Sequence, residues 1–259
     1  MRDFILYNAP QSTCSQRVRF ALHAKGLDFV EHKLDLFSGD QLTPEYLSIN
    51  PNGVVPSLVH DGKPVNDSAV ILEYLEDILP DVAPMRPRDA HSVAQMRLMM
   101  RFIDEVPAPA IRAPSYNFAF LPLYQAMSEE AFLELCEKKP LRREFLLRMG
   151  RTGFPQSDMD EALGRLRRAI ERMAKWLTES GGPWLMGPHF SLADIAIMPI
   201  LVRMDDINLG SFWDDHPMVA DWLEQIWAAA AFGDTYYHGS LLTEKFPHLA
   251  NANPPASTR

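Results

Sequence analysis

The sequence predicts a two-part protein in which a small α/β domain with a four-stranded mixed sheet precedes an all-helical domain. Three observations predict this class. Strand-like and helix-like runs alternate over the first eighty or so residues, Pro80, Pro84 and Pro87 then interrupt regular structure, and the later segments have the apolar spacing of helices. The predicted parts are a first domain at residues 1–80, a linker at 81–89 and a helical domain at 90–259.

The elements of the first domain are predicted in the order βαβαββα. Gly26 ends the first helix, and Asp61-Gly62 is a strong hairpin signal between the last two strands. The first six predicted elements lie, in that order, at residues 4–7, 16–25, 27–33, 44–47, 57–60 and 64–65, and the segment 67–75 starts a last helix that ends before Pro80.

The helical domain contains a segment, residues 195–202, that is apolar on every side and therefore predicts a buried central helix. Before it stands a capping box, with Ser191 at the N-cap, Asp194 at the third helical position and Phe190 as a hydrophobic staple against Ile195. Water cannot reach the N–H groups that begin a buried helix. We therefore expect Ser191 and Asp194 to satisfy those groups and to be structural, not catalytic.

Composition limits the classes of function. The hydrophobic fraction of 47% and the charged fraction of 23% are ordinary for a globular protein. A formal charge of −9 argues against nucleic-acid and anionic-membrane partners. Two cysteines are too few for a disulfide framework, Met1-Arg2-Asp3 begins no apolar signal region, and no apolar run is long enough for a transmembrane helix. We expect a cytoplasmic protein with reduced thiols, and the sequence predicts no metal site.

The turn Ser12-Thr13-Cys14-Ser15 lies between a predicted strand and a predicted helix. It places three hydroxyls and one thiol at a helix N-terminus, where the backbone N–H groups and the helix dipole favour negative charge. Such a turn suits a bound thiolate or carboxylate. The alternative is that Ser12 or Thr13 only caps the helix.

Several motifs together make the chain resemble the cytosolic glutathione transferases. They are Val55-Pro56 before a strand, Asp67-Ser68 at the start of a helix, and the capping box at Ser191 in a later helical domain. The resemblance implies a thioredoxin-like domain that binds glutathione, a helical domain that supplies most of the pocket for a small electrophilic substrate, and a homodimer.

The resemblance also implies how glutathione is held. Pro56 would be cis and would direct the backbone of Val55 to the cysteinyl part of the tripeptide. Ser68 would hold the γ-glutamyl carboxylate, with Asp67 near the γ-glutamyl ammonium group, and Gln41 is a candidate for the glycyl end.

The motif Ser-x-Cys-Ser-x-Arg-Val-Arg, which begins at Ser12, looks most like the zeta form of the family. Carried across, the hydroxyl of Ser12 would donate to the glutathione sulfur and would lower the thiol pKa from ~8.5 toward neutrality. Two alternatives stay open. Ser15 could be the donor, or Cys14 could form a mixed disulfide with glutathione, as in omega-like and beta-like relatives.

Residues 115–160 form a longer excursion than a minimal transferase needs. Its segments Met127-Ser128-Glu129-Glu130-Ala131-Phe132 and Gly153-Phe154-Pro155-Gln156 are similar to the bacterial β-etherases of lignin breakdown. This resemblance implies glutathione-dependent cleavage of a β-aryl ether beside a carbonyl. The aromatic run at 116–124 then supplies the predicted substrate pocket, and its alternative role is core packing or dimer contact. The predicted pocket residues are Tyr116, Phe118 and Phe120.

Other functions remain open at this stage. A maleylacetoacetate-type isomerase or a generic detoxifying transferase would use glutathione in the same way. A glutathione-transferase-like scaffold could also serve as a binding or stress protein without catalysis. The presence of Ser12, Pro56, Asp67 and Ser68 argues against the last, because a non-catalytic scaffold does not need all four.

Overall fold

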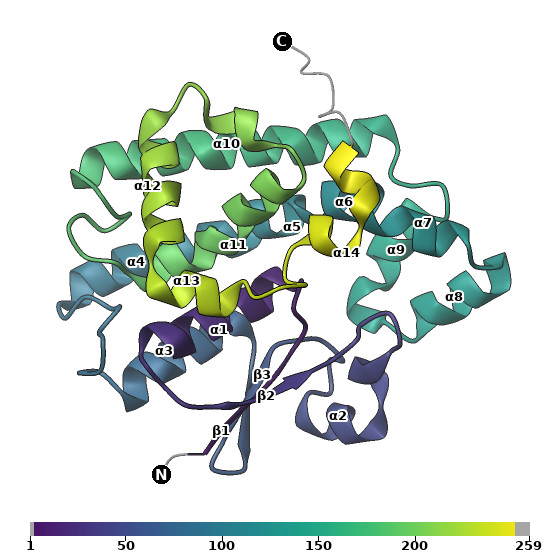
Figure 1. Cartoon of the computed structure of the whole chain (residues 1–259), viewed down its shortest axis with the longest axis horizontal. Coiled ribbons are helices and arrows are strands. Elements are labelled where there is room, and N and C mark those ends of the chain that lie inside the picture. The colour runs from purple at the N-terminus through teal and green to yellow at the C-terminus, as the bar shows by residue number, and fades with distance from the viewer. Residues whose placement is uncertain (1–2, 252–259) are drawn as a thin grey trace.

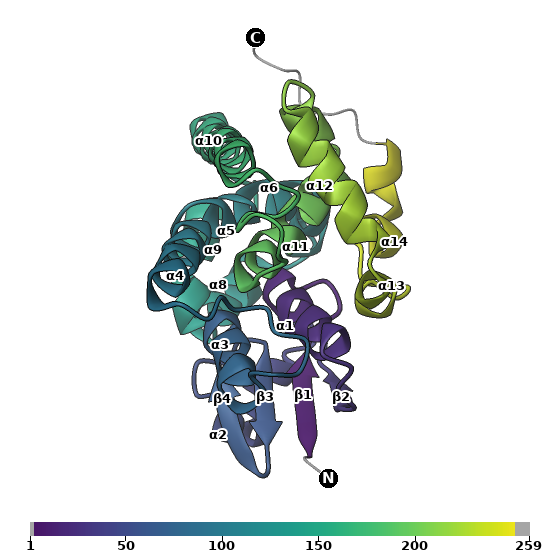
Figure 2. The ribbon, with the colours of Figure 1, turned by 90° about the vertical axis from the view of Figure 1, so that its left-hand side faces the viewer.

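The computed structural model describes residues 3–251, which form a sheet layer below a larger helical assembly (Figure 1). Met1 and Arg2, part of the segment expected to contain no signal region, lie outside the described residues. Seen from the side, α1 and α3 lie between the strands and the helices that follow residue 90, whereas α2 lies at the level of the strands (Figure 2). The helical assembly therefore packs on the sheet through α1 and α3, which both come from the first part of the chain.

The sheet has four strands in the order β2-β1-β3-β4. Strand β1 runs parallel to β2 and antiparallel to β3, with Leu6 opposite Leu58, and β3 pairs antiparallel with β4. Asp61 and Gly62 both have positive φ angles, as a tight hairpin turn requires. The predicted mixed sheet is confirmed. Its strands are β1 (Phe4–Asn8), β2 (Val30–Lys33), β3 (Ser57–His60) and β4 (Lys63–Asn66).

Helix α1 and strand β2 begin at different residues from those predicted, for local reasons. Helix α1 (Thr13–Ala24) begins three residues earlier, because Ser12 is extended and caps it. Strand β2 begins at Val30 because the N–H of Leu27 donates to the carbonyl of Leu22 and so closes α1 in a Schellman motif. The other helices of this part are η1 (Asp40–Leu42), α2 (Pro44–Ile49) and α3 (Ser68–Ile78).

The rest of the described chain is helical, as predicted. None of the described helices is long and apolar enough to cross a membrane. The α-helices are α4 (Ala90–Glu105), α5 (Pro107–Ala110), α6 (Arg112–Ser115), α7 (Leu121–Gln125), α8 (Glu129–Glu137), α9 (Arg143–Met149), α10 (Gln156–Ser180), α11 (Leu192–Asp206), α12 (Pro217–Ala228), α13 (Ala230–Thr235) and α14 (Leu242–Lys245). Short η segments lie at Tyr116–Phe120, Pro140–Arg142, Gly210–Trp213 and Pro247–Asn251.

Helix α11 is the buried centre of the molecule. All of residues 195–202 are buried, and the capping box of Ser191 and Asp194 is present. One hydrophobic core joins α11 to residues of the sheet layer such as Leu6 and Leu58. A second, smaller core lies under α7, α8 and α9 and includes Phe132. The division of the chain at residues 80 and 90 stays a prediction.

Candidate active site

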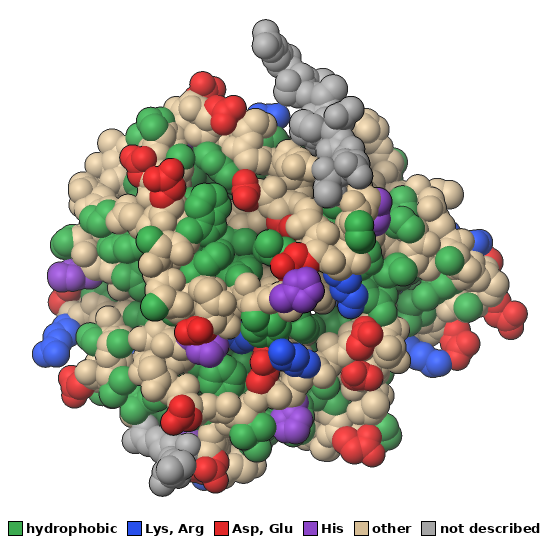
Figure 3. All heavy atoms as spheres, in the orientation of Figure 1, with side chains coloured by type: hydrophobic (Ala, Val, Ile, Leu, Met, Phe, Trp, Pro, Cys, Tyr) green, Lys and Arg blue, Asp and Glu red, His purple; other side chains and the backbone are tan. Residues whose placement is uncertain are grey.

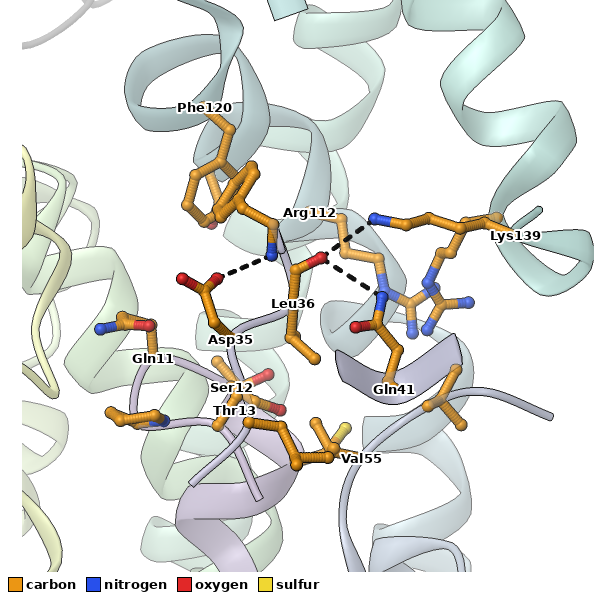
Figure 4. A pocket seen from close by; sticks show the side chains of 18 of the residues that line it. Gln11, Ser12, Thr13, Asp35, Leu36, Gln41, Val55, Arg112, Phe120 and Lys139 are labelled. Carbon is orange, nitrogen blue, oxygen red and sulfur yellow. Dashed lines mark hydrogen bonds between the residues drawn. The ribbon is translucent and has the colours of Figure 1, made fainter. Parts of the chain in front are cut away.

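The turn that begins at Ser12 opens onto a cavity of about 440 Å³ (Figure 4). This volume is in the range of small-molecule sites. One wall comes from within residues 9–17, 33–41 and 52–55, and the other comes from within residues 108–120 and 139–142. The cavity therefore lies between the sheet-bearing part of the chain and the helical part.

Two of the three candidate groups for the sulfur contact face this cavity. Ser12 and Cys14 line it, whereas Ser15 is fully buried and is not among the lining residues. The hydroxyl oxygen of Ser12 accepts the N–H of Ser15 at 3.3 Å, which leaves the hydroxyl hydrogen of Ser12 available to donate. The hydroxyl of Ser15 instead accepts the N–H of Ala9 at 3.3 Å. Capping α1 and donating to a ligand are thus compatible roles for Ser12.

Val55 presents free backbone groups to the cavity. The peptide bond between Val55 and Pro56 is cis, and Pro56 itself is buried outside the cavity wall. The hydroxyl of Tyr46 and the amide of Asn50 both donate to the carbonyl of Val54, at 2.6 and 2.8 Å, and hold the loop. Within residues 3–251 the N–H and carbonyl of Val55 have no hydrogen-bond partner. They can therefore pair with an extended peptide ligand.

Gln41 lies at another part of the cavity and has an unpaired oxygen. Its Nε2 donates to the carbonyl of Leu36 at 3.3 Å, and its buried Oε1 accepts no hydrogen bond from the described residues. A buried polar atom without a partner costs free energy, which a ligand N–H can relieve. Lys139 Nζ donates to the same Leu36 carbonyl at 3.2 Å, so Gln41 and Lys139 converge there (Figure 4).

Asp67 and Ser68 lie outside the cavity lining but are linked to it through Arg17. Asp67 caps α3, since its Oδ1 accepts the N–H groups of Ala69 and Val70. Ser68 is buried, and its hydroxyl accepts from Arg17 at 3.4 Å. Arg17 lines the cavity and forms an ion pair with Asp104 at 2.6 Å. Arg17 is part of the sequence motif that begins at Ser12, but the motif alone does not indicate its link to Ser68.

The aromatic run divides between the cavity and the cores. Tyr116 and Phe120 line the cavity and meet edge to face, with ring centroids 5.0 Å apart. Phe118 is not a lining residue and packs against both hydrophobic cores. Hydrophobic side chains also gather on the outside of the molecule over α7, α8 and α9 (Figure 3). Leu141 is one of the exposed leucines of this region, and it borders the cavity.

The cavity has a positive lining although the chain has a net charge of −9. Asp35 and Asp40 are its carboxylates, and the cations outnumber them. Burial lowers the pKa of Arg112 and of Lys139. Sequence reasoning missed this feature because the cations come from distant segments with no common motif. The positively charged lining residues are Arg17, Lys33, Arg112, Lys139, Arg142, Arg203 and Lys245.

The arrangement suits an anionic peptide ligand. In the part of the chain that the structure describes, no group of three or more His, Cys, Asp or Glu side chains could hold a metal ion. The cavity instead combines a hydroxyl donor, free peptide groups, cations and an aromatic wall. These groups can bind an anion, donate a hydrogen bond to it and pack against a flat second molecule.

Comparison with known proteins places these features in a family context. Two domain models match the chain, the N-terminal domain of glutathione S-transferases at residues 11–78 and the C-terminal domain at residues 156–225. Protein LigF of Sphingobium sp. is 31% identical over 240 residues, covering 89% of this chain and 92% of LigF. Glutathione S-transferase 1 of Dianthus caryophyllus is 50% identical over 199 residues, covering 76% and 75% of the two chains. The crystal structure of the Sphingobium β-etherase LigF superposes with a TM-score of 0.81 at 30% identity, covering 90% and 98%.

Proposed function

This chain belongs to the glutathione S-transferase family, and we propose that it attacks an aromatic electrophile with the thiolate of glutathione, cleaving a β-aryl ether derived from lignin. The observation that carries the proposal is the free hydroxyl of Ser12 in a positively lined cavity whose far wall holds Tyr116 and Phe120. We also propose that the protein forms a homodimer, as its family relationship suggests.

The residues of the cavity fit the tripeptide. Glutathione carries two carboxylates, and the excess of cations in the lining matches this charge. The backbone of Val55 would pair with the cysteinyl unit, and Gln41 would meet the glycyl end, where its unpaired oxygen can accept a peptide N–H. Ser68 and Arg17 would hold the γ-glutamyl carboxylate, with Asp67 near the ammonium group.

Ser12 would have the catalytic role. Its hydroxyl would donate to the sulfur at the N-terminus of α1, and both the hydrogen bond and the helix dipole favour the thiolate over the thiol. The thiolate supplies the nucleophile, which displaces a phenoxide from the ether carbon to give a thioether, and the phenoxide takes a proton from water. Tyr116 and Phe120 would pack on the aryl ring and keep the ether carbon in line with the sulfur.

Replacing Ser68 by alanine should weaken glutathione binding about tenfold. The variant removes one hydroxyl contact with a charged carboxylate, worth ~1.5 kcal/mol. Titration calorimetry of the purified protein with glutathione gives the dissociation constant. The exposed Ser48, whose hydroxyl donates to the carbonyl of Glu45 on the surface of α2, provides the matched Ser48→Ala control. An unchanged affinity in Ser68→Ala would remove this residue from the site.

The β-aryl ether reaction should be visible with a chromogenic substrate. We expect the protein, given glutathione and an α-keto β-aryl ether with a chromogenic phenol, to release the phenol and form the glutathione thioether in equal amounts. Absorbance follows the phenol and mass spectrometry the thioether. Turnover far below that on a generic aryl halide would leave a glutathione transferase with a different substrate. Faster cis–trans isomerisation of a maleyl-type substrate would favour the isomerase alternative.

A further inference from the structure

Two arginines in the cavity wall have no counter-ion among the described residues. Arg112 begins α6 and Arg142 ends the η segment at Pro140–Arg142, and both line the cavity. Among residues 3–251 neither guanidinium forms an ion pair, and that of Arg112 has no hydrogen-bond acceptor. Within the described part of the chain, the guanidinium of Arg142 donates only to the carbonyl of its neighbour Leu141, at 3.1 Å. Both cations can therefore bind a ligand.

Other cations near Arg142 in the chain do have counter-ions. Arg143, the residue after Arg142, points to the surface and pairs with Glu137 at 2.7 Å and with Glu144 at 2.6 Å. Lys138 likewise pairs with Glu134. On the same segment, the outward cations are neutralised by carboxylates, whereas Arg142, which faces the cavity, is not.

Arg112 and Arg142 belong to the wall of the cavity that also carries Tyr116 and Phe120. Arg112 begins α6 and Tyr116 is its C-cap residue, four positions later, so their side chains lie about one helical turn apart on the same wall of the cavity. Lys139 shares the Leu36 carbonyl with Gln41 and so lies at the proposed glycyl end of glutathione. The contacts proposed for glutathione use neither Arg112 nor Arg142, so both are available to a second ligand.

We propose that Arg112 and Arg142 bind an anionic oxygen group, a carboxylate or a phenolate, on the aromatic second substrate. This inference rests on the proposed function and narrows its substrate class. Guanidinium groups bind such anions with two parallel hydrogen bonds, and partial burial strengthens the attraction. Two neighbouring arginines also repel each other, and an anion between them removes that repulsion. An aromatic ring that carries the anion would lie against Tyr116.

Binding of matched aromatic pairs tests the inference without any reaction. Titration calorimetry, with and without saturating glutathione, compares 3,5-dinitrobenzoate with 3,5-dinitrobenzamide, which have no leaving group. A second arm compares 4-nitrophenolate, above neutral pH, with 4-nitroanisole. We expect tighter binding of at least one anion than of its neutral partner, and the arm that shows it identifies the group. Arg112→Gln and Arg142→Gln should each weaken that anion about 10- to 100-fold and the neutral partner by less than about threefold.

Two control variants separate the outcomes. Arg143→Gln, which removes the paired surface arginine, should leave the preference for the anion unchanged. Arg142→Lys should retain more of the preference for the anion than Arg142→Gln does, because lysine keeps the charge. It should retain less than the wild type, because the planar guanidinium is lost. Equal binding of anion and neutral partner by the wild type, or equal losses for both in Arg142→Gln, overturns the inference. The inference is also overturned if Arg112→Gln and Arg142→Gln raise the dissociation constant for glutathione but leave the preference for the aromatic anion unchanged. The arginines would then bind the tripeptide. Absence of glutathione binding in the wild type would instead overturn the proposed function.

Discussion

Replacing Ser12 by alanine should lower kcat/KM for glutathione conjugation by about 10²-fold. Removal of one preorganised donor to an anion in an active site has an effect of this size. The variant should also raise the pKa of the bound thiol, because the hydrogen bond that favours the thiolate is lost. Less thiolate is then present at neutral pH, and the acidic limb of the rate profile moves to higher pH. Thiolate absorbance against pH, together with kcat/KM against pH, measures both effects.

Helix capping must be separated from the effect on the sulfur. Ser12 also caps α1, so Ser12→Ala should cost about 1 kcal/mol of folding stability. Thermal unfolding detects that loss, and Ser12→Thr, which keeps a hydroxyl, should recover most of the activity. Cys14→Ala should leave the pKa of the bound thiol nearly unchanged. A larger shift in Cys14→Ala than in Ser12→Ala, or a mixed disulfide on Cys14 in the mass spectrum, would place the protein in the thiol-transfer class.

Replacing Asp194 by alanine should lower the free energy of unfolding by about 3–5 kcal/mol. The carboxylate is fully buried at the start of α11. It accepts from the N–H groups of Leu185 and Ser191, both at 2.9 Å, from the hydroxyl of Ser191 at 2.7 Å and from the indole of Trp222 at 2.9 Å. Alanine leaves these donors buried without an acceptor, and each unsatisfied group costs about 1–3 kcal/mol before relaxation.

Urea unfolding followed by tryptophan fluorescence measures the loss, since Trp222 reports directly on this region. Asp215→Ala is a suitable control, because Asp215 is exposed and should change stability by less than about 0.5 kcal/mol. A loss below about 1 kcal/mol in Asp194→Ala would mean that water or a rearranged loop replaces the carboxylate. The structural role assigned to Asp194 would then be wrong.

Local features of this protein could be predicted because the interacting groups are close in the chain. The hairpin at Asp61-Gly62 depends on two backbone angles, and the box of Ser191 and Asp194 closes within one helical turn. The order of strands and helices follows from apolar periodicity. The starts of α1 and β2 were misplaced by three residues each, since a cap at Ser12 and a Schellman motif at Leu27 decide them.

The cavity could not be predicted from the sequence, because the residues that line it are far apart in the chain. The turn of Ser12 and the aromatic run were visible, but nothing local says that Tyr116 faces the cavity while Phe118 packs into the cores. The same holds for the bond from Trp222 to Asp194, which joins residues 28 apart in the chain.

The sequence by itself determined the class of fold, the family, the capping box and the turn that presents Ser12. Short-range hydrogen bonding and periodicity determine the fold class, the capping box and the turn, whereas the family was indicated by the resemblance of the combined motifs. Only the tertiary structure decided that Ser12 and Cys14 face the cavity while Ser15 does not. It also decided that Arg112 and Arg142 lie there with no counter-ion from residues 3–251. A positive cavity in a chain with a net charge of −9 arises because folding brings cations from separate segments together and pairs other cations with carboxylates at the surface. The net charge adds all of these groups together, whereas the local charge of the cavity depends on where each group lies in space.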